Sequence, residues 1–269
     1  MIRLSLAIPV LAILLFAFSV SFHAQEYPTP AVSTASATTP SPRPSNLSDE
    51  ELARLYLVRK QFREAQDIFH KLTVEYPKNA IYWNELGIAF HNQIELAAAL
   101  KCYEKAAKLD SHYADAVNNM GTIWYERKKY PKAIRAYKRA IGLRNDFSPF
   151  YMNLGYAYFG KKEYDDSIAS FRKALELDPD AFDIGKSRSG TIIQDRSIRT
   201  DRGLFYFLLA KSFASAGNIE RCVIYLRKAR DDGYTDINSA KSDPSFAKVI
   251  SDPAVQEALA PKPIEPSEP

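Results

Sequence analysis

Residues 83–90 read WNELGIAF, and the small and aromatic residues Ala99, Tyr103 and Ala106 follow them. The same order of large and small residues returns 34 residues further on, and once more after another 34. The second copy contains Val117, Met120, Gly121, Trp124, Ala133, Tyr137 and Ala140, and the third contains Tyr151, Leu154, Gly155, Tyr158, Ser167, Phe171 and Ala174. The chain therefore contains an internal repeat, and the 34-residue period of this repeat decides the fold.

Each copy predicts two α-helices. The first apolar positions fall at i, i+3, i+4 and i+7, and the later ones at i, i+4 and i+7, which are the spacings of a single helix face. Small residues such as Gly87 on the first helix and Ala99 on the second fall where the two helices must come close. A single helical hairpin cannot bury its apolar face, so the hairpins must stack on one another.

This spacing resembles the tetratricopeptide repeat, whose pattern runs aromatic, Leu-Gly, Tyr, Ala, Phe or Tyr, Ala and Pro. The clear copies start at Ala80, Ala114 and Ser148. Stepping backward gives a further unit from Asn46, and stepping forward past an insertion gives a fifth from Gly203. The resemblance implies an all-α, right-handed superhelical solenoid of about five helical hairpins, in which the first helices line a concave groove.

Two helix starts are predicted near the C-terminus. Ser242-Asp243-Pro244 and Ser251-Asp252-Pro253 are each typical of a helix start, because a capping side chain precedes Pro at the first helical position. We expect two short helices here to cover the last repeat.

The seven segments predicted from the composition follow in chain order. They are a signal peptide or N-terminal anchor at 1–24, a disordered Pro-, Ser- and Thr-rich linker at 25–45, repeats one to four at 46–181, a basic insertion at 182–202, repeat five at 203–234, capping helices at 235–260 and a disordered tail at 261–269.

The N-terminus predicts export. Residues 4–20 are almost wholly apolar, Arg3 precedes them and small residues follow, as in a secretory signal peptide. Cleavage would leave a periplasmic or secreted protein. The alternative is an uncleaved membrane anchor, since the apolar run approaches the length that spans a bilayer.

The residues that usually carry chemistry are scarce. His23, His70, His91 and His112 form no pair with ligand spacing, and no catalytic motif is found in the sequence. Cys102 and Cys222 fall three repeats apart, too far for a disulfide, and we expect Cys222 in the core and Cys102 partly exposed. A net charge of +4 does not demand nucleic acid. The sequence thus predicts no enzyme, no cofactor and no metal site.

The groove is the candidate binding site, and it predicts a protein or peptide partner. By the geometry that the resemblance implies, the inward positions are Asn84, Ile88, His91, Asn118, Asn119, Thr122, Tyr125, Asn153 and Tyr156. An amide both donates and accepts hydrogen bonds, so a row of Asn can bind an extended peptide backbone. The alternative is that Asn119 and Asn153 bridge neighbouring helices. Lys residues at the inward positions, which some relatives use to hold a C-terminal carboxylate, are missing, so that mode is disfavoured.

Two basic regions stand apart from the groove. One runs from Arg127 to Arg139 on a predicted second helix and the turn before it, where a solvated outer face is the simpler interpretation and an acidic partner the other. The other is the insertion, in which Arg188, Arg196 and Arg199 could contact an anionic partner. The insertion is either a plain surface loop or a segment that helps to hold a ligand. Our prediction is a non-catalytic protein-interaction scaffold of the cell envelope, and the alternative is an enzyme or enzyme accessory whose site is formed by residues 183–202.

Overall fold

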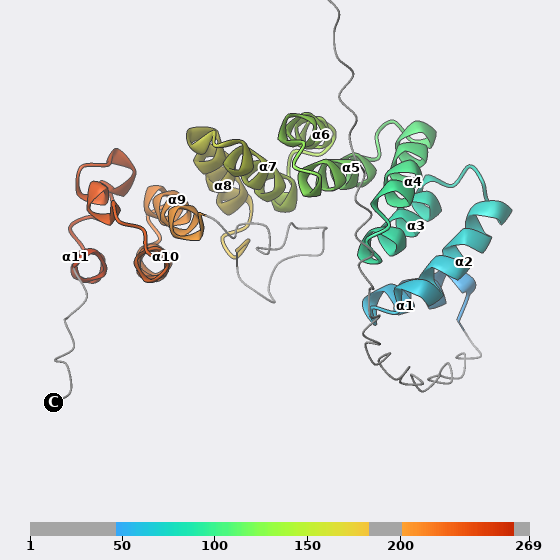
Figure 1. Ribbon diagram of the computed structural model, residues 1–269, viewed down its shortest axis with the longest axis horizontal. Helices are drawn as coiled ribbons and strands as arrows, with labels where there is room; N and C mark the ends of the chain where they lie inside the picture. Colours follow the sequence, from blue (N-terminus) through green and yellow to red (C-terminus); the bar gives the residue numbers. More distant parts are fainter. Residues whose placement is uncertain (1–46, 183–200, 261–269) are drawn as a thin grey trace, which may run out of the picture. The chain divides into compact units, whose positions relative to one another are not determined.

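Figure 1 shows the computed structural model of the chain, which describes residues 47–182 and 201–260. The predicted signal segment, the linker, the tail and the insertion residues Arg188, Arg196 and Arg199 lie outside the described residues. The described residues belong to one unit that begins at Asn46. Its elements are α1 (Asp49–Val58), α2 (Phe62–Glu75), α3 (Ala80–Asn92), α4 (Leu96–Leu109), α5 (Ala114–Glu126), α6 (Tyr130–Leu143), α7 (Ser148–Lys161), α8 (Tyr164–Leu177), α9 (Arg202–Ser215), α10 (Ile219–Asp231), the 3-10 helices η2 (Ile237–Lys241) and η3 (Pro244–Phe246), and α11 (Pro253–Leu259).

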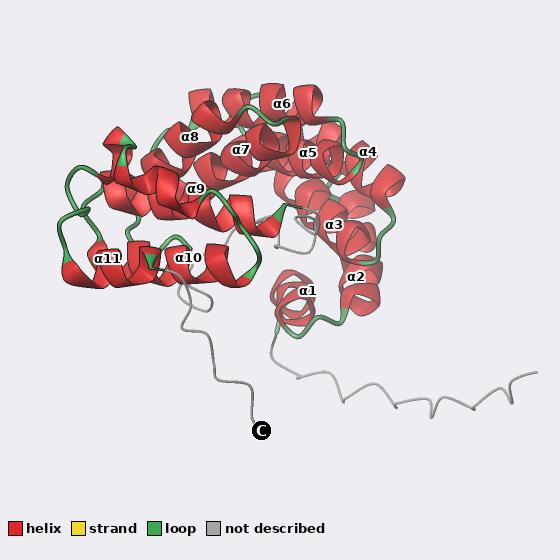
Figure 2. Cartoon of the chain, turned by 60° about the vertical axis from the view of Figure 1, so that its left-hand side comes forward, coloured by secondary structure: helices red, strands yellow, loops and turns green. Residues whose placement is uncertain are grey.

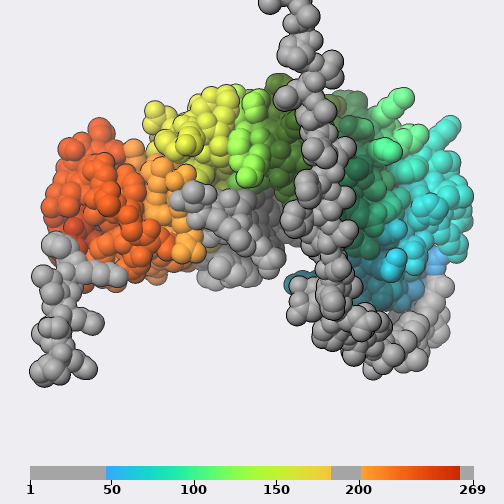
Figure 3. Space-filling view, in the orientation of Figure 1, coloured from blue at the N-terminus to red at the C-terminus, as the bar shows by residue number. Residues whose placement is uncertain are grey.

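The helices pair in sequence order and the pairs stack, which confirms the all-α repeat fold. Each second helix packs against the first helix of its own pair and against the first helix of the next. In Figure 2, α3, α5 and α7 lie on the inner side of the stack, and α4, α6 and α8 lie on its outer side. Figure 3 shows the same succession as bands of colour from cyan to orange, because each pair contacts its neighbours in sequence. No strand occurs in residues 47–182 or 201–260.

The small residues of each copy lie where the two helices of a pair touch. A Cβ atom added at Gly121 would lie 2.6 Å from Cε1 of Tyr137, whose ring is completely buried. Gly87 faces Tyr103 and Gly155 faces Phe171 in the same way. Interiors are packed too densely to admit an extra atom at such a distance. The glycines are therefore required by the aromatic rings opposite them.

The turn inside each pair contains one residue with a left-handed backbone. These residues are Lys60 (φ 59°), Ile94 (φ 66°), Lys128 (φ 55°), Lys162 (φ 68°) and Gly217 (φ 77°). The geometry closes the preceding helix, as where the N–H of Glu95 donates to the carbonyl of Phe90 at 3.0 Å. Glycine adopts this conformation without penalty, but a side chain costs about 1–2 kcal/mol. Four of the five turns thus carry strain that the sequence did not reveal.

The C-terminal segment begins its helices at the predicted residues. Asp243 and Asp252 each accept a backbone hydrogen bond at 2.8 Å from two residues further on, and a proline follows each of them. The element that follows Asp243, η3, is a three-residue 3-10 helix with hydrogen bonds between residues three apart, whereas the element that follows Asp252, α11, is an α-helix. A second 3-10 helix, η2, precedes them and was not anticipated.

This segment covers the inner side of α9. The Phe246 ring is completely buried and stacks on Phe207 with centroids 5.8 Å apart. Next to it, Nζ of Lys211 pairs with Asp243 at 2.7 Å. Phe207 and Lys211 stand one turn apart on the side of α9 that would otherwise face the groove. The inward surface of the fifth repeat is therefore occupied by the chain itself.

Both cysteines are buried free thiols, Cys102 with 6% and Cys222 with 0% of its surface exposed. Burial raises the pKa of Cys102 to about 11 and that of Cys222 to about 12, so neither is a thiolate at neutral pH. The expectation that Cys102 would be partly exposed is wrong, because its helix turns that side chain toward Gly87 of α3.

None of the helices in residues 47–182 and 201–260 has the length and apolar content needed to cross a membrane.

Candidate functional site

The first helices α3, α5 and α7 bring the predicted inward residues together, but most of them are buried. Asn84, Asn118, Asn119, Thr122, Tyr125, Asn153 and Tyr156 each expose at most 6% of their surface. Ile88 and His91 are half-buried. Burial of this degree means that most of the predicted site contributes to packing between helices.

Four of these residues form a chain of amide hydrogen bonds across three repeats, which we call the asparagine ladder. Nδ2 of Asn119 donates to Oδ1 of Asn84 at 3.0 Å, and Nδ2 of Asn153 donates to Oδ1 of Asn118 at 3.0 Å. Nδ2 of Asn118 donates to Oδ1 of Asn119 at 3.3 Å. The ladder joins α3 to α5 and α5 to α7.

The ladder corrects the interpretation of these amides as open donors and acceptors. The amino group of one amide donates to the carbonyl oxygen of another. In two of these bonds the partners are 35 residues apart and belong to adjacent first helices. The alternative that Asn119 and Asn153 bridge neighbouring helices is the arrangement found in the structure. Because an unpaired buried amide is costly, these bonds fix the spacing of α3, α5 and α7.

Two buried tyrosines are also packing residues. The ring of Tyr125 meets Tyr130 edge-on with centroids 5.6 Å apart, and Tyr156 stacks on Phe205 of the next repeat at 5.5 Å. Their predicted role as apolar contacts for a peptide is therefore corrected, because neighbouring helices already supply the apolar contact. Thr122 likewise accepts a hydrogen bond from the hydroxyl of the buried Tyr137 at 3.3 Å.

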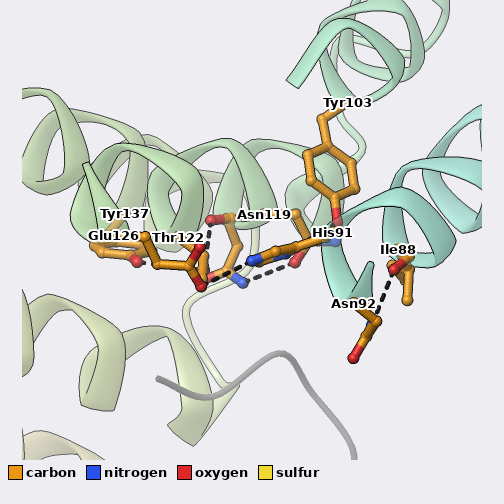
Figure 4. Close-up of polar contacts among 9 residues, drawn as sticks. Ile88, His91, Asn92, Tyr103, Asn119, Thr122, Glu126 and Tyr137 are labelled. Carbon is orange, nitrogen blue, oxygen red and sulfur yellow. Dashed lines mark hydrogen bonds and ion pairs between the residues drawn. The ribbon is translucent and has the colours of Figure 1, made fainter. Parts of the chain in front are cut away.

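His91 lies at the edge of the ladder and joins two repeats. Figure 4 shows its ring reaching from α3 to Glu126 of α5, with Nε2 and the carboxylate Oε1 2.8 Å apart. Its Nδ1 lies 3.4 Å from the hydroxyl of Tyr103. Only 10% of the His91 side chain is exposed, compared with 40% for Glu126. His91 is thus a link between hairpins whose carboxylate partner remains accessible.

One accessible part of the inner surface is a stripe on α3 made by Ile81, Glu85, Ile88 and Asn92, which we call the α3 stripe. Residues at i, i+4, i+7 and i+11 share one face of a helix. Ile81 exposes 43% of its surface, Asn92 is exposed, and Glu85 and Ile88 are half-buried. Figure 4 shows Ile88 and Asn92 together, with the Asn92 side chain bonded back to the Ile88 carbonyl at 2.9 Å.

Glu85 is the ionisable residue of the α3 stripe. Burial raises the pKa of its carboxyl group, Arg54 of α1 opposes this, and Asp115 of α5 and Glu50 of α1 add to it. Among the described residues no group forms a hydrogen bond or ion pair with this carboxylate. Glu85 is not among the site residues predicted from the sequence, although its place next to Asn84 in the repeat is a signal that could have selected it.

Other kinds of site find no support in the described residues. Within residues 47–182 and 201–260, no group of three or more His, Cys, Asp or Glu side chains is placed to hold a metal ion. Arg188, Arg196 and Arg199, the predicted anionic-partner contacts, lie outside these ranges. A cleft of about 540 Å³ lies between α8, α9 and the C-terminal segment that follows α10, which we call the cap. Arg172, Phe213 and Lys248 are among the residues that line the cleft. Nζ of Lys248 donates a hydrogen bond to the carbonyl oxygen of Ser215 at 2.9 Å.

The fold and the inner face define an α-helical solenoid of stacked hairpins. Tetratricopeptide repeat models match residues 50–114 and 148–181, and a TPR repeat model matches residues 121–162. The chain belongs to the tetratricopeptide-repeat family. No curated protein matches it.

Several solved structures are similar to this chain. PilF of Pseudomonas aeruginosa is 21% identical with a TM-score of 0.50, and the match covers 78% of this chain and 86% of PilF. MamA of Desulfovibrio magneticus RS-1 is 16% identical with a TM-score of 0.48, covering 72% of this chain and 96% of MamA. YrrB, described as a TPR protein with an unusual peptide-binding site, is 16% identical with a TM-score of 0.45, covering 71% of this chain and 89% of YrrB. At 21% identity the likeness to PilF is one of fold.

Proposed function

We propose that this protein is a non-catalytic scaffold of the cell envelope that binds a peptide or protein segment along the inner face of its first three repeats. Membership of the tetratricopeptide-repeat family supports a role in protein–protein interaction. The observation that carries the proposal is the α3 stripe, in which an unpaired carboxylate lies between two accessible isoleucines.

The stripe defines the chemistry of the partner. Ile81 and Ile88 lie on either side of Glu85 and offer apolar contact to an aliphatic or aromatic side chain. Glu85 is partly desolvated in the free protein, so a Lys or Arg of the partner can pair with it at a lower desolvation cost than at an open surface. Asp115 and Glu50 raise the pKa of Glu85 further, and Arg54 opposes them. We therefore expect a segment with one basic residue flanked by apolar ones.

The asparagine ladder supports this role indirectly. By joining α3, α5 and α7 it holds the stripe in one position before the partner arrives. A binding surface that is already ordered loses less conformational entropy on association. His91 and Glu126 extend the same rigid connection to the accessible edge of α5.

Site-specific crosslinking tests the proposal. A photoreactive residue at Ile81, on the α3 stripe, should form adducts with a partner in the native host, whereas one at the exposed Lys101 of α4 should not. The charge reversal Glu85→Arg should weaken partner binding at least tenfold, because a hydrogen bond to a charged group contributes about 1.5–3 kcal/mol. Glu104→Arg on the exposed side of α4 is the matched control. Adducts from Lys101 alone, or equal loss in both charge reversals, would refute groove binding.

The location in the envelope rests on the apolar residues 4–20 and has its own test. If that segment is a cleaved signal, the mature chain begins near Phe22 or Gln25 and fractionates with the soluble envelope proteins. N-terminal sequencing of the protein from its host measures this directly. An intact Met1 in the membrane pellet would instead indicate the anchored form.

A further inference from the structure

The outer side of α6 carries an unusual concentration of positive charge. Residues 127–144 contain eight Lys and Arg and no Asp or Glu, although the whole chain has a net charge of only +4. Seven of the eight are exposed. We call these seven the α6 basic face: Arg127, Lys128, Lys129, Lys132, Arg135, Lys138 and Arg139. They lie on the turn before α6 and on the helix itself, away from the side that buries Ala133 and Tyr137.

None of the seven forms an ion pair with a carboxylate in the described part of the chain. The eighth, Arg144, is paired with Asp115 at 2.7 Å. The equivalent helix of the next repeat differs, because α8 pairs Lys173 with Glu176 at 3.0 Å and Arg172 with the same carboxylate at 3.9 Å. The outer helices of this fold can therefore balance their charges, and α6 does not.

The arrangement opposes the stability of α6. Lys132 and Arg135, Arg135 and Lys138, and Arg135 and Arg139 stand three or four residues apart, where like charges repel. The first turn of the helix holds Lys132 and no acidic residue, although its dipole favours negative charge there. Folding does not account for this pattern.

Aromatic rings hold several of these cations in place. Nζ of Lys132 lies 4.6 Å from the centroid of the Trp124 ring, and the guanidinium of Arg127 lies 5.7 Å from it. Nζ of Lys138 lies 5.4 Å from the ring of Tyr158. A cation over a ring is attracted to it and loses rotational freedom. The positive groups are thus positioned before any partner binds.

We propose that the α6 basic face docks an acidic segment of a partner protein, as a second interaction surface separate from the inner groove. The face is one helix wide: α4 presents the exposed Glu104 on one side, and α8 presents the exposed Asp165 and Asp166 on the other. A plane of anionic lipid would meet these carboxylates, whereas a single chain lying along α6 avoids them. The 14 residues of α6 extend about 21 Å, which corresponds to about six residues of extended chain.

Fluorescence anisotropy with the full chain tests this surface. The probe is a labelled octapeptide of alternating Glu and Asp, and its Gln and Asn counterpart is the neutral control. We expect the acidic peptide to bind, with an affinity that falls as salt rises from about 50 to 300 mM, and the neutral peptide not to bind. The triple variant Lys132→Gln, Arg135→Gln, Arg139→Gln should bind about tenfold more weakly, because each exposed ion pair contributes a small part of the affinity.

The matched control removes three cations from neighbouring outer helices. The variant Lys101→Gln, Arg172→Gln, Lys173→Gln changes the net charge equally and should alter affinity less than twofold. Because the α6 charges repel one another, the first variant should melt no lower than the parent, so that a loss of binding is not a loss of fold. Equal weakening in both variants, binding of the neutral peptide, or binding of anionic lipid vesicles in preference to the acidic peptide would overturn the proposal.

Discussion

Replacement of Gly121 by alanine tests whether the close helix contact governs the fold. The added Cβ would lie 2.6 Å from Cε1, 2.8 Å from Cδ1 and 3.1 Å from Cζ of Tyr137, so one edge of the ring must move. The ring has no free space, since Tyr137 is completely buried and its hydroxyl is bonded to Thr122. Overpacking of this kind costs about 1–3 kcal/mol.

The matched control is Gly142→Ala in α6, where an added Cβ meets no atom within 4 Å. Replacement of Gly by Ala gains about 1 kcal/mol of helix propensity in a helix interior, as at Gly121, and less at Gly142, which is the last residue but one of α6. The difference between the two free energies of unfolding is therefore a lower bound on the packing cost at Tyr137. We expect Gly142→Ala to be stabilising and Gly121→Ala to be lower by about 1–3 kcal/mol.

Thermal unfolding followed by circular dichroism measures both variants. For a protein of this size, 1 kcal/mol corresponds to about 2–4 °C in melting temperature. A third variant combines Gly121→Ala with Tyr137→Leu. In the Tyr137→Leu background, Gly121→Ala should cost less stability than it costs in the parent, because the obstructing ring is gone. Equal melting temperatures for Gly121→Ala and Gly142→Ala would refute the repeat register on which every inward residue depends.

Further predictions address the ladder, the stripe, the turns and the cap. A double-mutant cycle of Asn84→Ala and Asn119→Ala in urea unfolding should give a coupling energy of about 0.5–3 kcal/mol, and strictly additive losses would contradict the ladder. Glu85→Gln should raise stability at pH 7, because burial raises the folded pKa above 4.5 and penalises the charged form; the gain over the parent should shrink as pH falls through that raised pKa, and a constant gain would argue against the assignment. Ile94→Gly should raise the melting temperature by removing about 1–2 kcal/mol of left-handed strain, whereas no change would mean that the turn is relaxed. Phe246→Ala should cost about 3–5 kcal/mol if the cap is part of the folded unit, and a shallow loss would show that it is dispensable.

The 34-residue period predicted the fold because it constrains many residues at once. A glycine opposite an aromatic ring recurs at Gly87, Gly121 and Gly155, and each of these contacts is found where the spacing placed it. Helix starts at Ala80 and Ala114 follow from the same register. Such agreement arises because burial depends on the side of the helix, which periodicity reports directly.

The turns could not be read from the sequence in the same way. Lys60, Ile94, Lys128 and Lys162 adopt a left-handed backbone that usually favours Gly or Asn. The residue types give no hint of this, since the conformation is imposed by the two helices that each turn must join. Only Gly217 in the fifth pair displays the expected signature.

The positions of the inward residues on their helices were predicted, but the contacts of their side chains were not. Family geometry placed Asn118 and Asn119 on the inner face of α5, yet an amide that binds a peptide and an amide that binds its neighbour look identical in sequence. One signal was present: Asn84 and Asn119, like Asn118 and Asn153, stand 35 residues apart, one more than the repeat period. That offset turns the second residue of each pair back toward the preceding helix and favours a bond between repeats.

The use of amides for cohesion determines where binding can occur. Because Asn119 is bonded to Asn84, and Asn153 to Asn118, the accessible groups of the inner face are those outside the ladder, chiefly the α3 stripe and the carboxylate of Glu126. The C-terminal segment covers the inner side of α9 through Phe246, whereas Ile81 and Asn92 on the inner side of α3 are exposed. Positive charge is concentrated on the opposite, outer side at α6. We propose that the α3 stripe holds a basic segment and the α6 basic face an acidic one, so that the two partners do not compete, and this arrangement would be lost if either charge were placed on the other side.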